Sequence, residues 1–101
     1  MPTVPYRDQL LKRLEDPAHA AGYLTACLEE SDEVFLIGLR DVVDAHGGMA
    51  ELAHATGLNR EALYRTLSEN GNPRLSSLGL IIEALGLRLS IESSPDGPRA
   101  A

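Results

Sequence analysis

The sequence predicts an all-α fold, with a helical arm at the N-terminus, a group of short helices after it and one short β-strand near the C-terminus. Apolar residues recur at helical spacing along most of the 101 residues. Two of the helical stretches meet at Gly57 with room only for a tight corner. A six-residue segment near the end alternates apolar and polar residues instead, which is typical of a strand.

The composition is that of a globular domain. An apolar fraction of 44% and a charged fraction of 24% are ordinary, and with one Phe, three Tyr and no Trp the core must be mainly aliphatic. The single Cys27 excludes an internal disulfide and fits a reducing compartment. No apolar run approaches the roughly 20 residues of a membrane span, and the N-terminus has no apolar signal region. We therefore expect a cytoplasmic protein.

The N-terminal arm, residues 1–31, is predicted to contain two helices. Asp8 can cap the first, which should end at Glu15. Pro17 is favoured at the first position of the second helix, predicted over residues 17–30. The apolar sides of these helices are formed by Leu10, Leu11 and Leu14, and by Ala21, Leu24 and Leu28.

A third helix is predicted over residues 33–45, after a polar break in which Ser31 or Asp32 provides the cap. Its apolar residues stand at i, i+4, i+7 and i+8, and they are Phe35, Leu39, Val42 and Val43. This amphipathic pattern predicts a helix that packs on both the arm and the rest of the core. The His46-Gly47-Gly48 run should end it.

The stretch from Gly48 to Ser68 predicts a helix-turn-helix. Gly57 can take a positive φ without steric cost, so the chain can turn there within a few residues. Asn59 is a good N-cap for the second helix, which in such a motif can enter the major groove of DNA. The buried sides of the two helices should be formed by Leu52, Ala53, Leu63 and Leu67.

The last part of the chain predicts a loop over residues 69–74 and then a final helix. Ser76 or Ser77 should cap this helix, and Gly86 should end it. Its apolar stripe is formed by Leu78, Ile81, Ile82 and Leu85. The alternating segment Leu87–Glu92 predicts a short strand, which would either pair with another chain or lie as an extended tail on the last helix.

The chain thus divides into a helical arm (residues 1–31), a helix-turn-helix DNA-binding domain with its terminal strand (32–92) and a disordered tail (93–101). The net charge of −6 is unevenly distributed along it. Residues 1–45 carry four bases and nine acids, whereas residues 46–92 carry four bases and five acids. The acidity therefore lies mostly outside the predicted DNA-reading helices.

Residues 50–89 resemble the lambda-repressor-like helix-turn-helix domains. The residues that carry the resemblance are Leu52-Ala53, Gly57, Leu63, the Ser68–Pro73 loop, Leu78, Ile82 and Ala84-Leu85-Gly86-Leu87. Within that superfamily, the Gly57–Arg65 run followed by Gly71-Asn72-Pro73-Arg74 is similar to the HigA-like antidotes of addiction modules. The likeness covers about residues 7–92.

This resemblance implies an antitoxin that binds and silences a RelE/HigB-type toxin, a small basic ribonuclease that cleaves mRNA. Such antitoxins also bind operator DNA as homodimers and repress their own operon. Two other functions fit the residues: a stand-alone transcriptional repressor without a toxin, and a protein-interaction module that uses the helix-turn-helix as a scaffold.

The candidate DNA contacts are polar residues on and after the second helix of the motif. Arg can bind guanine, Asn can pair with adenine, and Glu can accept a hydrogen bond from cytosine. The loop residues of the set would contact phosphates. Surface solvation of the charges and core packing of the tyrosine are the alternatives. The set is Asn59, Arg60, Glu61, Tyr64, Arg65, Asn72 and Arg74.

The candidate toxin-binding surface is acidic, because a ribonuclease should carry a basic active surface that an acidic arm can complement. The predicted set is Leu10, Leu14, Glu29, Glu30, Asp32 and Glu33, and the acidic run continues to Asp41 and Asp44. Plain solubility is the alternative for the charges. For the leucines, the alternative is packing of the arm onto the third helix.

Catalysis has little support in the sequence. The three histidines, His19, His46 and His54, have no Cys or carboxylate partners at metal-ligand spacing. No Gly-rich phosphate loop is present, and Cys27 is expected to be a small buried apolar residue. We therefore expect no metal, no cofactor and no enzymatic activity.

Overall fold

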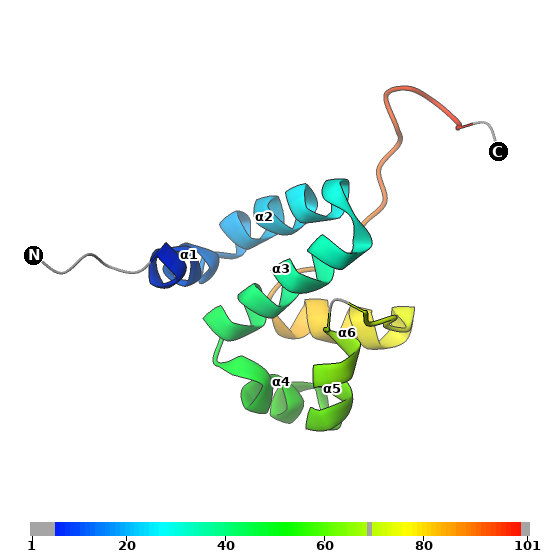
Figure 1. The fold of residues 1–101 in the computed structure, drawn as a ribbon. Helices are drawn as coiled ribbons and strands as arrows, with labels where there is room; N and C mark the ends of the chain where they lie inside the picture. Colours follow the sequence, from blue (N-terminus) through cyan, green and yellow to red (C-terminus); the bar gives the residue numbers. More distant parts are fainter. Residues whose placement is uncertain (1–5, 69, 100–101) are drawn as a thin grey trace, which may run out of the picture.

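The computed structural model describes residues 6–68 and 70–99, which form six α-helices (Figure 1). The helices are α1 (Tyr6–Leu14), α2 (Pro17–Glu30), α3 (Asp32–Ala45), α4 (Gly48–Thr56), α5 (Arg60–Thr66) and α6 (Leu75–Ala84). The all-α prediction is confirmed for these residues. Positions 1–5 of the predicted arm, position 69 of the predicted loop and positions 100–101 of the predicted tail lie outside them.

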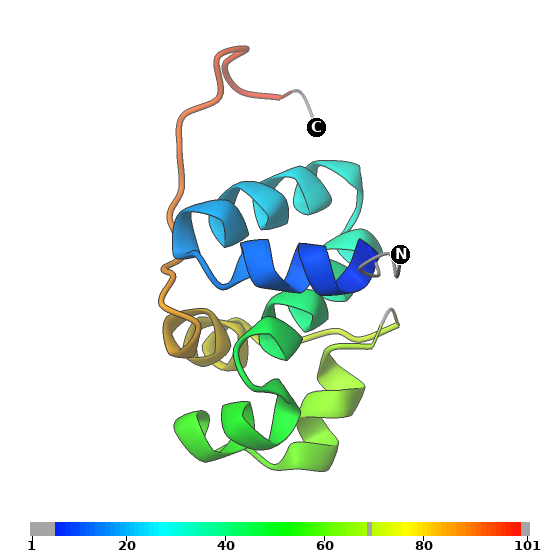
Figure 2. The same ribbon diagram turned by 90° about the vertical axis from the view of Figure 1, so that its left-hand side faces the viewer.

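Helix α3 is the centre of the fold. Helices α1 and α2 pack on one side of it, and α4 packs against its C-terminal part and in turn contacts α5 and α6 (Figures 1 and 2). The side chains of Leu39, Val42 and Val43 are fully buried, as the helical pattern predicts. Around them lies a core of Leu14, Ala20, Leu24, Leu36, Met49, Leu52, Leu63, Leu67, Ile81, Ile82 and Leu85. The division into arm, DNA-binding domain and tail remains a prediction.

Side-chain caps start three of the helices. Asp16 accepts a hydrogen bond from the amide of Ala18, with Pro17 as the first helical residue. Ser31 and Asn59 cap α3 and α5 through amides three residues further on. Such caps satisfy amides that have no partner inside the helix. They place the beginnings of α2 and α5 where the sequence predicts them, and they select Ser31 of the two candidates for α3.

The corner between α4 and α5 is made by Gly57, which has a φ of 74°. Its amide donates to the carbonyl of Ala53 and closes α4, and the next helix begins at Arg60. A residue with a Cβ would be strained in this conformation. The prediction of two short helices joined by a tight turn is confirmed.

Two predicted caps are wrong. Asp8 lies within the first turn of α1, because that helix already begins at Tyr6, and it ends at Leu14. Arg74, which makes no side-chain capping bond, precedes α6, so Ser76 and Ser77 lie inside its first turn. Helix α6 ends at Ala84 with Leu85 as its C-cap, and Gly86 follows at a φ of 79°.

The predicted strand over Leu87–Glu92 is also wrong for the described chain, which contains no strand. The backbone of this segment makes no hydrogen bond to another extended segment among the described residues. Alternation of apolar and polar residues alone does not make a strand, because the ladder needs a partner. Residues 93–99 form neither a helix nor a strand.

Candidate functional site

Two arginines flank the ring of Tyr64 on the outer side of α5. The guanidinium carbon of Arg60, one turn earlier on the same helix, lies 5.9 Å from the ring centre. That of Arg40, which comes from α3, lies 6.0 Å away. Both distances suit a cation–π interaction. Tyr64 itself is 42% exposed and does not belong to the core, so the ring serves to gather positive charge at the surface.

Arg40 is the residue that the sequence prediction missed. It belongs to a helix about twenty positions upstream of α5, and no spacing rule relates the two helices. The tertiary fold, in which α4 contacts both α3 and α5, brings its side chain to Tyr64. The surface around α5 therefore includes a residue from outside α4 and α5.

The other predicted DNA-binding residues at this helix differ in which of their polar groups are available to a partner. Glu61 and Arg65 are exposed, so their charged groups are free to contact a partner. The side-chain oxygen of Asn59 accepts a hydrogen bond from the amide of Ala62 at 3.1 Å. A bidentate pair with adenine needs both the oxygen and the nitrogen of an Asn side chain. In this structure the cap therefore occupies one of the two lone pairs of the Asn59 side-chain oxygen.

Asn72 and Arg74 are exposed in the loop before α6. The loop is folded back tightly at Gly71, whose amide donates to Ser68 at 2.8 Å. A Cβ at Gly71 would lie 2.0 Å from the carbonyl oxygen of Thr66, so only glycine fits there. This close approach fixes the start of the short segment that carries Asn72 and Arg74.

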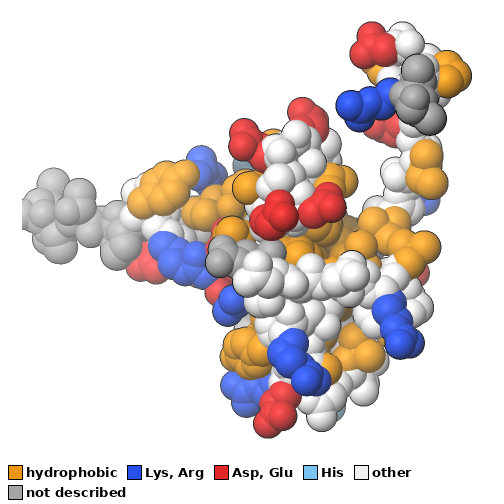
Figure 3. Space-filling view, turned by 45° about the vertical axis from the view of Figure 1, so that its right-hand side comes forward, with side chains coloured by type: hydrophobic (Ala, Val, Ile, Leu, Met, Phe, Trp, Pro, Cys, Tyr) orange, Lys and Arg blue, Asp and Glu red, His pale blue; other side chains and the backbone are white. Residues whose placement is uncertain are grey.

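Four carboxylates gather where α2 ends and α3 begins. They are Glu29, Glu30, Asp32 and Glu33, and all are exposed. No described cation lies within salt-bridge distance of any of them. Negative charge suits the N-terminus of α3 but opposes the dipole at the C-terminus of α2. Figure 3 shows several acidic side chains close together over the upper middle of the molecule, whereas basic ones lie mainly below them, with others at the upper left and on the C-terminal segment.

Asp41 and Asp44, further along α3, differ in exposure: Asp41 is buried and Asp44 is exposed. Arg7 of α1 donates to Asp41 at 2.8 Å and also pairs with Asp44, and the Tyr23 hydroxyl donates to the other oxygen of Asp41 at 2.8 Å. The extension of the acidic run is therefore wrong for Asp41, which is buried, whereas Asp44 is exposed and paired with Arg7. The ion pair with Asp41 raises the pKa of Arg7. Burial, followed by the bond to Asp41, raises the pKa of Tyr23.

The two leucines of the predicted toxin-binding set lie in different places. Leu14 is 2% exposed and belongs to the core, where a partner cannot reach it while the helices stay packed. Leu10 is half-buried against that core. For Leu14, the structure supports the alternative of packing between the arm and α3.

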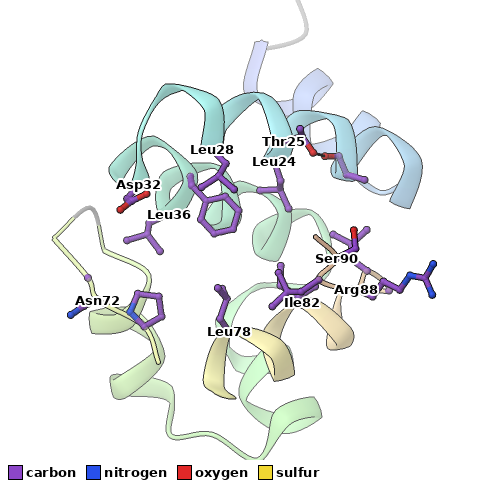
Figure 4. A pocket seen from close by; sticks show the side chains of 17 residues that line it. Leu24, Thr25, Leu28, Asp32, Leu36, Asn72, Leu78, Ile82, Arg88 and Ser90 are labelled. Carbon is purple, nitrogen blue, oxygen red and sulfur yellow. Dashed lines mark hydrogen bonds between the residues drawn. The ribbon is translucent and has the colours of Figure 1, made fainter. Parts of the chain in front are cut away.

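An apolar groove with a volume of about 710 Å³ separates α2 and α3 from α6. Figure 4 shows Leu24, Leu28 and Leu36 reaching in from one side and Leu78 and Ile82 from the other, with Arg88 and Ser90 at one edge. Leu28 is 53% exposed. The predicted apolar side of α2 is therefore only partly right, because Ala20 and Leu24 are buried whereas Ala21 and Leu28 face the groove.

The described residues also bear on metal binding and on crossing a membrane. Within residues 6–68 and 70–99, no three His, Cys, Asp or Glu side chains are placed to hold a metal ion. The Nε2 atom of His46 lies 3.1 Å from the carbonyl oxygen of Leu14, at the end of α1. None of the described helices combines the length and the apolar character that crossing a membrane requires.

Comparison with known proteins gives one family. The model of a family described as "Probable addiction module antidote protein" matches residues 7–93. An uncharacterized protein of Haemophilus influenzae (strain Rd) is 34% identical over 73 residues, which cover 71% of this chain and 74% of the relative. No solved structure matches the chain at a significant level.

Proposed function

The chain belongs to the family of probable addiction module antidote proteins, and from this premise we propose that it is the antitoxin of a type II toxin-antitoxin module. The observation that carries the proposal is the family match, which reaches into all six helices. An antitoxin of this kind acts by binding its toxin in an inactive complex. We propose no catalytic role for the chain, and we place it in the cytoplasm, where its free thiol at Cys27 would stay reduced.

The finer proposal is that the protein also represses its own operon, as the HigA-like, lambda-repressor-like antitoxins do. Helices α4 and α5, joined at Gly57, would be the helix-turn-helix. Exposed side chains of α5 would read base edges, and Asn72 and Arg74 would contact phosphates. The pairing of Arg40 and Arg60 with Tyr64 supports this proposal, because it concentrates positive charge beside α5 in a chain whose net charge is −6.

The proposed DNA-binding form is a homodimer. Two copies would present their α5 helices roughly 34 Å apart, which is one turn of B-DNA. A dimer that buries both α5 helices would count against DNA binding in that form.

The proposed toxin is a small basic ribonuclease of the RelE/HigB type. The support is the group of four exposed carboxylates at the junction of α2 and α3. Two of them, Glu29 and Glu30, oppose the dipole of their own helix, so helix stability does not explain their position. A basic partner would gain from them.

The test uses the adjoining reading frames and the DNA upstream of the gene. We expect a neighbouring frame for a small basic protein that is toxic alone and harmless when this chain is co-expressed. We also expect the purified chain to bind the upstream DNA with an affinity that falls as salt increases. Changing Arg60→Ala and Arg65→Ala together should abolish specific DNA binding and leave neutralisation of the toxin intact.

Other results would point elsewhere. DNA binding without any neighbouring toxic frame would indicate a stand-alone repressor. Neutralisation without DNA binding would indicate an interaction module in which the helix-turn-helix is a scaffold. Loss of both activities in the double variant, with its helix content unchanged, would contradict the assignment of DNA and toxin to separate surfaces.

A further inference from the structure

The segment Arg88–Glu92 leaves the helical body with no partner along its backbone among the described residues. It emerges beside the groove between α2 and α6 and then runs away from the helices (Figures 1 and 2). Leu89 is 48% exposed and Ile91 is fully exposed. An extended segment of this kind presents unpaired amide and carbonyl groups that a second extended segment can bind.

The order of residues in this segment is complementary to itself. In an antiparallel pair of two copies centred on Ser90, Arg88 of each copy faces Glu92 of the other. Leu89 of each copy faces Ile91 of the other, and the two-fold symmetry repeats both pairs. Opposite charges and apolar residues placed directly across two strands stabilise the pairing.

Neighbouring registers lose this match. Centred on Leu89, the pairing puts Arg88 opposite Ser90, and centred on Ile91 it puts Glu92 opposite Ser90. Each alternative leaves the two charges unpaired with each other. The sequence of the segment therefore favours the register about Ser90.

The position of the groove indicates which face of the two paired segments would cover it. Leu89 lines its edge, and a residue opposite Leu89 on a partner strand projects from the same face. The partner copy's Ile91 would therefore lie over the groove, at the edge where Figure 4 shows Arg88 and Ser90. This contact would remove apolar surface of both copies from water.

We propose that two copies of the chain associate through residues 88–92, paired antiparallel about Ser90, with the Ile91 side chain of each copy covering the groove of the other. The proposal specifies the interface of the homodimer in the proposed function. It rests only on the proposal that the chain forms a homodimer. It requires neither DNA nor toxin.

The experiment measures association of the full chain by sedimentation equilibrium. The variants Arg88→Glu and Glu92→Arg each place like charges opposite one another twice, so each should dimerise at least tenfold more weakly than the unchanged chain. An equimolar mixture of the two variants restores both charge pairs and should form a heterodimer of nearly the original affinity. The double variant Arg88→Glu with Glu92→Arg should likewise form a homodimer.

Two substitutions of exposed apolar residues form the second part of the experiment. Ile91→Asp should abolish the dimer, whereas Leu75→Asp, at an exposed leucine of α6, should leave it unchanged. All these side chains are exposed, so circular dichroism should show the same helix content for every variant. A monomer at all concentrations, a dimer that tolerates the single charge reversals, or a mixture that does not recover affinity would each overturn the proposal. None of these results would bear on toxin neutralisation, which is measured separately.

Discussion

The guanidinium carbon of Arg40 on α3 lies 6.0 Å from the centre of the Tyr64 ring on α5. This contact joins a residue outside the proposed helix-turn-helix to the surface proposed to read DNA. Arg40→Ala should therefore weaken binding to the upstream DNA by about tenfold or less and lower the salt slope by about one, as the loss of one phosphate contact does. Binding is measured by fluorescence anisotropy at several salt concentrations.

Arg13→Ala is the control for the Arg40 variant. It removes the same charge from an exposed position on α1. If both variants weaken binding equally, the effect comes from net charge, and Arg40 does not belong to the DNA-binding surface.

The bond between Tyr23 and Asp41 predicts a loss of stability at alkaline pH. Burial and this bond raise the pKa of Tyr23 above its usual value of about 10, so the folded chain holds the phenol proton more tightly than the unfolded chain. The resulting stabilisation is complete below about pH 10 and is lost as the pH rises from there towards the raised folded value. The slope cannot exceed about 1.4 kcal/mol per pH unit, and water at the partly exposed ring reduces it.

Tyr23→Phe tests this prediction. Below pH 10 it should cost about 1–2 kcal/mol of unfolding free energy, because Asp41 loses one donor but keeps Arg7. Above pH 10 the difference from the unchanged chain should shrink. Tyr6→Phe, at an exposed tyrosine, is the control in urea denaturation. A difference that stays constant up to pH 11.5 would contradict the assignment.

Gly38 of α3 packs against Cys27 of α2, where there is no room for a Cβ. A Cβ there would lie 2.7 Å from the Cys27 sulfur, so Gly38→Ala should destabilise the chain despite the better helix propensity of alanine. We expect a net loss of up to about 2 kcal/mol, since overpacking costs about 1–3 kcal/mol and propensity returns about 1 kcal/mol. Thermal and urea unfolding measure the change.

Two other helical glycines are matched controls for Gly38. A Cβ at Gly22 or Gly79 would meet no atom of another element within 4 Å, so alanine should stabilise the chain by up to about 1 kcal/mol at each. Adding Cys27→Ala to the Gly38 variant should recover part of the loss. Equal changes in unfolding free energy for alanine at all three glycines would show that helix propensity alone determines the effect.

Local rules in the sequence predicted most of the helices. Pro17 and Asn59 mark helix starts that the structure reproduces, because a cap acts on amides two or three residues away. The role of Asp41 could not be predicted, since its partner Arg7 is 34 positions distant. Arg40 was missed for the same reason. The alternation in Leu87–Glu92 does not make a strand within the described chain, because a strand depends on a partner and no other described segment pairs with it.

The acidic group at the junction of α2 and α3 leads to the last prediction. If it binds a basic toxin, Glu29→Lys with Glu30→Lys should weaken the complex by tenfold or more, mainly through slower association, because exposed charges steer the encounter. The same change should leave the unfolding free energy unchanged or slightly higher, since positive charge suits the C-terminus of α2. Surface plasmon resonance with the co-expressed toxin gives the two rates.

The matched control is Glu51→Lys with Glu83→Lys, which changes the net charge equally at exposed positions on α4 and α6. A general electrostatic effect would lower the association rate in both double variants alike. A specific surface would lower it only in the first. Unchanged association in the first variant would leave the four carboxylates as solubilising charges, and the toxin would then have to bind another face of the molecule.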